Sequence, residues 1–345
     1  MAFTLNSRTW KARTFDCRTL SALGAAGGAT TGPTLYGLAG TCAASIDNSI
    51  AGLTPSVAIP GYSSIDHATP IYVRNLDCWT EGASLNTRPF PVWANGSISP
   101  GRGGGCLVAP DVLILAQHQS TEIPDGSQFR WVAADNSVQT RTMTSSLNPA
   151  GDIRVGILNS PLPGSIGFCK VLPKTWPAYL WRVFQDSGEA GNAIIAGTAY
   201  GVPVLYITQD EDVLVAEWFL DPSDSHLATC FKPPFDSVRA SFYETLVGGD
   251  SGHACCLVVV SELVLLFTHD GVGPSGTMIT DYLDETNAAM TTLGSTHQLT
   301  QFDLSPYEVL EPEINWVVPA MPNEWASQNW AGIWTSRQMP IGWTA

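Results

Sequence analysis

Three polar side chains of this 345-residue sequence, Ser251, His118 and Asp152, are of the types that together carry out nucleophilic catalysis. Ser251 lies in the stretch LVGGDSGHACC, after two glycines and before a third. A serine hydroxyl is a weak nucleophile until a base takes its proton, and that base must be oriented and charge-balanced by a carboxylate. Glycine, aspartate and serine are also the commonest turn formers, so this stretch alone is compatible with an ordinary turn.

The candidate base and carboxylate each stand at the end of an apolar segment. His118 follows CLVAPDVLILAQ, and Asp152 opens DIRVGIL. Taken alone, a histidine at the end of a strand is most often structural, and an aspartate before a strand is most often a turn cap. The hypothesis of a catalytic triad therefore depends on whether the fold brings all three residues together.

The elements that must position these residues are predicted to be β-strands. From about residue 88 the chain consists of short segments rich in β-branched and aromatic residues, separated by Gly, Pro, Asn and Asp, which is typical of an all-β protein. So many short strands favour a sandwich or barrels over a parallel sheet. The predicted strands span residues 89–95, 105–110, 111–117, 127–134, 137–145, 152–159, 178–184, 192–200, 202–208, 213–220, 254–260 and 262–269.

One helix is predicted late in the chain, over residues 280–292. Ile279, Leu283, Thr286 and Met290 recur at helical spacing and should face the core, with Thr280 or Asp281 capping the start. The sequence therefore predicts an all-β domain over 88–293 that ends in a C-terminal helix.

The two ends of the chain differ from this domain. Residues 20–60 are rich in Gly, Ala, Ser and Thr without a helical period, so 1–87 is predicted to be an extended arm that docks on something else. The C-terminal tail, 294–345, holds many tryptophans, whose large apolar rings need burial. These are Trp316, Trp325, Trp330, Trp334 and Trp343.

Composition narrows the classes of protein. Acidic residues outnumber basic ones 31 to 16, which argues against binding to nucleic acid through phosphates. The sequence shows neither a secretory signal nor a stretch long enough to cross a membrane. Its eight cysteines are interpreted as reduced core thiols. Because no CxxC pair and no HxxxH spacing occurs, we expect no zinc site, no other metal and no cofactor.

The three motifs CLVAPDVLILAQH, DIRVGIL and GDSG, in this order, resemble those of the trypsin-like (chymotrypsin-fold) serine proteases. The segment GFCKVLP, 167–173, resembles the link between the two domains of that family. The resemblance covers residues 88–293 and implies two antiparallel six-stranded β-barrels with a cleft between them. It implies His118 as general base, Asp152 as its orienting partner and Ser251 as acyl-forming nucleophile, with the N–H groups of Gly249 and Ser251 as the oxyanion hole.

The same resemblance places three residues in the primary specificity pocket. Thr268 stands about where the family has a serine that hydrogen-bonds the triad aspartate. His269 is adjacent, and a pocket histidine selects glutamate in some relatives. Thr245 stands where an aspartate would select arginine or lysine, and because threonine is neutral we do not expect trypsin-type specificity.

Two departures from the family bear on the nucleophile. Gln119 stands where the disulfide partner of Cys106 would be. Asp250 corresponds to an aspartate that in some relatives pairs with a newly cut N-terminus, and a buried unpaired carboxylate is costly. We therefore expect a cation, Arg182 or Arg154, to pair with Asp250.

Two functions remain open at this stage. The first is a serine endopeptidase that acts on a polypeptide substrate through an acyl-enzyme intermediate. The second is a structural virion protein (capsid, decoration or tail), for example of a bacteriophage, that uses a protease-like fold as a scaffold and docks both arms on neighbouring subunits. The expected location is a virion or the interior of a microbial host, in an oligomer or particle, without nucleic acid or membrane as partner.

Overall fold

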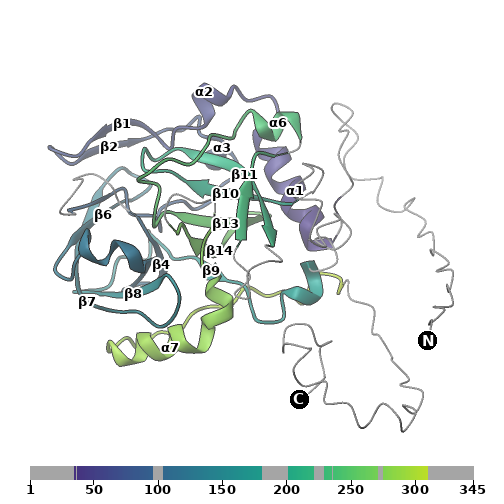
Figure 1. Cartoon of the computed structure of the whole chain (residues 1–345). Helices are drawn as coiled ribbons and strands as arrows, with labels where there is room; N and C mark the ends of the chain where they lie inside the picture. The colour runs from purple at the N-terminus through teal and green to yellow at the C-terminus, as the bar shows by residue number, and fades with distance from the viewer. Residues whose placement is uncertain are drawn as a thin grey trace, which may run out of the picture.

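The computed structural model describes residues 35, 37–95, 104–180, 201–220, 229–234, 236–270 and 275–309. These residues are mostly β-sheet with a few short helices, so the all-β prediction is confirmed. Two six-stranded sheets carry the architecture, and they lie side by side in Figure 1.

The first sheet holds the strands from the earlier part of the β region, in the order β3-β6-β7-β8-β5-β4. Strands β6, β7 and β8 follow one another as antiparallel neighbours, and the preceding strand β5 returns beside β8, which is a Greek key. The strands are β3 Trp93–Ala94, β4 Cys106–Ala109, β5 Val112–Ala116, β6 Gln128–Val132, β7 Val138–Leu147 and β8 Ile153–Leu158.

The second sheet has the order β12-β11-β10-β13-β14-β9. All its neighbours are antiparallel except β9, which runs parallel to β14. Strand β13 pairs with β10 and β14, so the chain enters the middle of this sheet directly after Ser251. The strands are β9 Lys170–Val171, β10 Val202–Ile207, β11 Val213–Leu220, β12 Thr229–Lys232, β13 Ala254–Val259 and β14 Glu262–Thr268.

Strand β5 shows why the segment before His118 is apolar at every position. Successive side chains of a strand point to opposite faces, and here both faces are buried. Leu113 and Leu115 pack inside the first sheet with Phe129. Val112 and Ile114 belong instead to the large core that continues through the second sheet. The two sheets therefore share a core, and β5 is fixed from both sides.

Ten of the twelve predicted strands are confirmed, with small shifts at their ends. The prediction is wrong for residues 178–180 of the segment 178–184, which are helical. The predicted strand at 192–200 lies outside the described residues. Strands β9 and β12 were not predicted, since two and four residues give too little pattern.

The late helix is confirmed in position and in its buried face. Residues Ile279–Tyr282 form a 3-10 turn, η3, that continues into α7, Leu283–Thr292. Ile279, Leu283, Thr286 and Met290 are all buried. The predicted caps are wrong, because the Thr280 hydroxyl donates to the carbonyl of Leu172 (2.9 Å) and Tyr282 precedes α7 without a side-chain cap.

The prediction of an extended N-terminal arm is wrong over residues 37–87. This segment folds into three helices and a hairpin of its own. Leu38, Cys42, Ile46 and Ile50 recur every four residues and are buried, which is a helical stripe that the many small neighbours concealed in the sequence. The elements are α1 Gly37–Ile50, α2 Pro55–Ala58, β1 Tyr62–Asp66, β2 Ile71–Arg74 and α3 Trp79–Gly82.

This N-terminal segment is packed onto both sheets. Helix α1 lies against β10 and β13 of the second sheet, on its outer side in Figure 1. The Trp79 indole N–H donates to the carbonyl of Val213 in β11 (2.8 Å). On the other side, the Arg74 guanidinium donates to the carbonyl of Val132 at the end of β6 (2.7 Å). Residues 37–87 are therefore part of the β domain and not an appendage to it.

Six of the eight cysteines fall within the described residues with side chains placed, and all six are free and buried, which confirms their interpretation as core thiols. The Trp-rich part of the predicted tail, from residue 310 onward, lies outside the described residues, as do Cys17 and the first 34 residues. Within the part of the chain that the structure describes, no helix combines the length and apolarity needed to cross a membrane.

Candidate active site

The pairing of β5 with β8 brings His118 and Asp152 together. In this antiparallel ladder Ala116 lies opposite Ile153, and the next N–H along, that of Gln117, donates to the carbonyl of Asp152 (2.9 Å). A 3-10 turn, η2 Gln117–Thr121, begins there and places His118 against the aspartate. The contact follows from two neighbouring strand ends, and it agrees with what the resemblance to the trypsin-like proteases implied for these two residues.

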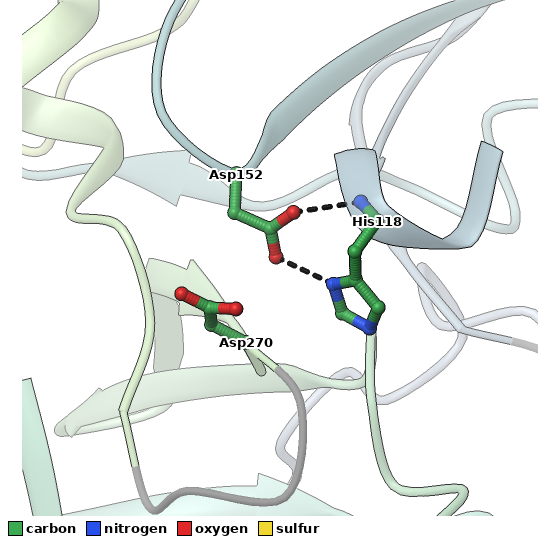
Figure 2. A group of neighbouring side chains, drawn as sticks. All are labelled: His118, Asp152 and Asp270. Atoms are coloured by element: carbon green, nitrogen blue, oxygen red, sulfur yellow. Dashed lines mark hydrogen bonds and ion pairs between the residues drawn. The ribbon is translucent and has the colours of Figure 1, made fainter.

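Asp152 holds His118 through both of its carboxylate oxygens. Oδ1 accepts from the backbone N–H of His118 (2.7 Å), and Oδ2 lies 2.8 Å from Nδ1 of the imidazole. Because a carboxylate accepts and does not donate, Nδ1 carries the proton. The other ring nitrogen, Nε2, then points away from Asp152 and is the atom that could accept a proton (Figure 2).

The surroundings make this imidazole more basic than a free one. The hydrogen bond to Asp152 raises the pKa of His118, partial burial opposes the rise, and the negative charges of Asp152, Asp270 and Glu122 add to it. The His118 side chain remains 36% exposed and that of Asp152 13%. A basic imidazole that reaches solvent on one side and is bonded to a carboxylate on the other is suited to accept and return a proton.

The residue before Ser251, Asp250, is buried (2% exposed), and among the described residues its carboxylate is bonded by backbone N–H groups and by no cation. Oδ1 accepts from the backbone N–H of Gln209 (2.9 Å), and Oδ2 accepts from that of Val247 (2.7 Å). Two N–H donors compensate much of the cost of burying the charge. Asp250 thereby anchors the Ser251 loop, residues 247–252, to the turn after β10.

The expected pairing of Arg154 with Asp250 is therefore wrong. Arg154 lies in β8, and its guanidinium donates to Asp125 (3.0 Å), to the Ser146 hydroxyl (2.8 Å) and to the carbonyl of Ile123 (2.5 Å). The positive charge of Arg154 is therefore balanced by Asp125 within the first sheet. The other candidate, Arg182, lies outside the described residues.

Two contacts place Ser251 beside the His118–Asp152 pair. The Gln119 amide donates to the carbonyl of Ser251 (2.6 Å), and Gln119 directly follows His118. The N–H of Gly252 donates to the carbonyl of His269 (2.9 Å), the residue before Asp270. Among the described residues, no hydrogen bond joins the Ser251 hydroxyl to His118.

The predicted oxyanion donors have free N–H groups in the described part of the chain. Within it, neither Gly249 nor Ser251 donates its N–H to a backbone carbonyl. Gly249 has φ +126°, a conformation that residues with a Cβ rarely adopt. Glycine at 249 thus lets the loop turn sharply just before Asp250.

Glycine at position 252 is required by packing as well as by its φ of +80°. A Cβ there would lie 2.0 Å from the Gln119 amide oxygen, closer than any real contact. Gly104 approaches from the other side, where a Cβ would meet the carbonyl carbon of Gly252 at 3.1 Å. Three segments of chain therefore meet closely behind Ser251. Neither Gln119 nor Gly104 was among the site residues predicted from the sequence, although both contact the Ser251 loop.

The side chain from the end of β14 that lies beside Asp152 is that of Asp270 and not that of Thr268. Asp270 has a carboxylate oxygen within 4.8 Å of ligand atoms of both His118 and Asp152 (Figure 2). Thr268 is buried in β14, where it pairs with Ala254. The sequence prediction named Thr268, two residues before Asp270, because the end of β14 could not be located to the residue from its sequence.

The other two predicted pocket residues lie in different environments. His269 is fully buried, and its ring packs edge to face against Tyr206 (5.9 Å between centroids) and Phe267 (6.2 Å). Burial, with a smaller effect of His253, lowers the pKa of His269 to about 3, so its imidazole is neutral at neutral pH. Thr245 is exposed and lies five residues after the end of α6, Ser237–Ala240.

His118, Asp152 and Asp270 are also the group of side chains whose ligand atoms come close enough to hold a metal ion. Nδ1 of His118 already lies at hydrogen-bond distance from Asp152, so a proton and a cation would compete for the same atoms.

A scan against protein-family models finds no match for this chain, and a search of curated proteins finds none either.

Proposed function

We propose that this protein is a serine endopeptidase of the trypsin-like (chymotrypsin-fold) type. The observation that carries the proposal is the His118–Asp152 pair, bonded through Nδ1 with Nε2 directed away, next to a loop that presents Ser251 between two glycines. An imidazole oriented by a carboxylate beside a serine is the arrangement that activates a hydroxyl for attack on a carbonyl.

The strand order supports the finer part of the proposal, two β-barrels. In the first sheet the end strands β3 and β4 would become neighbours on closure. The N–H of Leu107 in β4 donates to the carbonyl of Pro89, four residues before β3 (3.1 Å), so the chain leading into β3 already reaches β4. We propose that both sheets close in this way and that the reaction takes place between them.

The proposed mechanism uses only groups of this chain. Ser251 Oγ attacks the carbonyl carbon of a peptide while Nε2 of His118 takes its proton, and Asp152 stabilises the imidazolium. The N–H groups of Gly249 and Ser251 donate to the oxyanion that forms. His118 then returns the proton to the leaving amine, and water releases the acyl group from Ser251 by the same route.

The decisive experiment is labelling of the full chain with a fluorophosphonate, which reacts with an activated serine. We expect the wild-type protein to be labelled, Ser251→Ala and His118→Ala to lose the label, and the matched variant Ser261→Ala, at an exposed turn serine, to keep it. Tryptic mapping should place the label on Ser251. If the wild-type protein is not labelled, the endopeptidase proposal is wrong and the scaffold function in a virion takes its place.

A further inference from the structure

Asp270 is placed in the site by the backbone on both of its sides. It lies two residues after the end of β14 and directly after His269, whose carbonyl accepts from the N–H of Gly252 in the Ser251 loop. Its own N–H donates to the carbonyl of Ser275 (2.9 Å), and His269 forms a β-bridge with Gly276. The backbone at Asp270 is therefore fixed by hydrogen bonds, and this fixes the position from which its carboxylate extends.

From this position the Asp270 carboxylate faces the same pair of groups that forms the candidate active site. It lies beside the Asp152 carboxylate, on the side of the imidazole where Nδ1 is located (Figure 2). Ligand atoms of Asp270, Asp152 and His118 lie within 4.8 Å of one another. One imidazole thus faces two carboxylates, and Glu122 is the further acidic group whose charge acts on it.

Two carboxylates this close repel each other when both are ionised, and a shared positive charge relieves the repulsion. Burial and the negative charge of Asp152 raise the pKa of Asp270, while the charge of His118 lowers it. A proton on His118 is therefore favoured by the negative charge of both neighbouring carboxylates. A neutral serine or threonine hydroxyl at this place would supply a hydrogen bond without this charge.

We propose that Asp270 is a positioning residue of the site: a second carboxylate that holds the His118–Asp152 pair and adds negative charge favouring the protonated imidazole. For catalysis this inference rests on the proposed endopeptidase function. The electrostatic part does not, because it concerns only the three side chains and the atoms between them.

The added charge has opposite consequences at the two ends of the pH range. Ser251 can be activated only while His118 is neutral, so a more basic imidazole costs activity in acid. In the transition state the imidazole is protonated, and there a second carboxylate is stabilising. Removal of the Asp270 charge should move the acid limb of the pH profile to lower pH and lower the alkaline plateau.

The first test is an NMR titration of His118 Cε1–H in the full-length protein, assigned with His118→Ala. We expect the pKa of His118 to fall in Asp270→Asn and in Asp270→Ser, and to return toward the wild-type value in Asp270→Glu. Asp152→Asn serves as the positive control and Asp135→Asn, in an exposed turn, as the negative one. An unchanged His118 pKa in both Asp270→Asn and Asp270→Ser, with a fall in Asp152→Asn, would overturn the inference.

The second test measures the rate of fluorophosphonate labelling between acid and alkaline pH. For Asp270→Asn we expect a plateau lower by about tenfold, in line with loss of orientation at a catalytic group, together with an acid limb at lower pH. A lower plateau without any movement of the acid limb contradicts the electrostatic role. If no variant is labelled at any pH, the endopeptidase proposal fails, while the NMR titration still decides the role of Asp270.

Discussion

The two halves of the candidate active site are held in different ways. In the first sheet, His118 and Asp152 stand at the paired ends of β5 and β8, and the backbone ladder itself brings them within hydrogen-bond distance. In the second sheet, the Ser251 loop precedes β13 and is held by residues outside it: Gln209 donates to Asp250, Gln119 donates to the carbonyl of Ser251, and the carbonyl of His269 accepts from Gly252.

This difference separates a part of the site that is locally determined from one that depends on assembly of the whole domain. The contact between His118 and Asp152 forms between two neighbouring strands in register, and Asp270 then joins it from beyond the end of β14. The serine loop needs the first sheet, the turn after β10 and the end of β14 to be in place together. We therefore expect the His118–Asp152 contact to withstand damage to the second sheet better than the serine loop does.

Asp152→Asn should have the largest effect on labelling of Ser251. An asparagine has one accepting oxygen where Asp152 uses two, and it carries no charge to balance an imidazolium, so we expect the labelling rate at neutral pH to fall by about 10⁴-fold. The same substitution at exposed Asp135 should leave the rate unchanged. A fall of less than about tenfold would mean that the first-sheet pair does not activate Ser251.

Ile46→Ala tests the dependence of the second sheet on the N-terminal segment. Ile46 is fully buried in α1, in the core shared with the second sheet. Truncating it should cost about 2–5 kcal/mol of unfolding free energy in urea denaturation. Ile71→Ala, at a side chain 55% exposed on β2, should change it by less than about 0.5 kcal/mol. Equal effects would restore the interpretation of residues 37–87 as an accessory arm.

Gln119→Ala should have the smallest effect, confined to the serine loop. It removes the hydrogen bond to the Ser251 carbonyl, worth about 1 kcal/mol, so we expect labelling to slow by about fivefold to tenfold. The NMR titration of His118 should stay near wild type, because Asp152 holds the imidazole independently. Gln128→Ala, at an exposed position of β6, is the control. A displaced His118 titration would show that the two halves are not separable.

Much of the first half of the site was predictable for a local reason. The apolar run before His118 and the run after Asp152 each indicate a buried strand. That these two strands pair, and so bring the two residues together, was implied only by the resemblance to the trypsin-like proteases. The face of α7 was predictable on the same basis, from Ile279, Leu283, Thr286 and Met290. Helix α1 carried an equally regular stripe, but its Ala, Ser and Thr residues suggested an extended arm.

The second half could not be located to the residue from sequence. Whether Thr268 or Asp270 reaches Asp152 depends on where β14 ends and how the following turn folds back, and a shift of two residues leaves the alternation of the strand intact. Arg154 does not pair with Asp250 but is bonded within the first sheet, and backbone N–H groups, which carry no sequence signal, donate to the Asp250 carboxylate.

By itself the sequence determined the all-β class, since this follows from the strand pattern, and it supplied the residue types of the candidate triad. The meeting of His118 with Asp152 was implied by the resemblance and required the pairing of β5 with β8. Only the tertiary structure decided that residues 37–87 complete the core, that Asp250 is held by backbone donors and that Asp270 joins the pair. Those outcomes depend on segments far apart in the chain, and such contacts are settled by packing and not by local propensity.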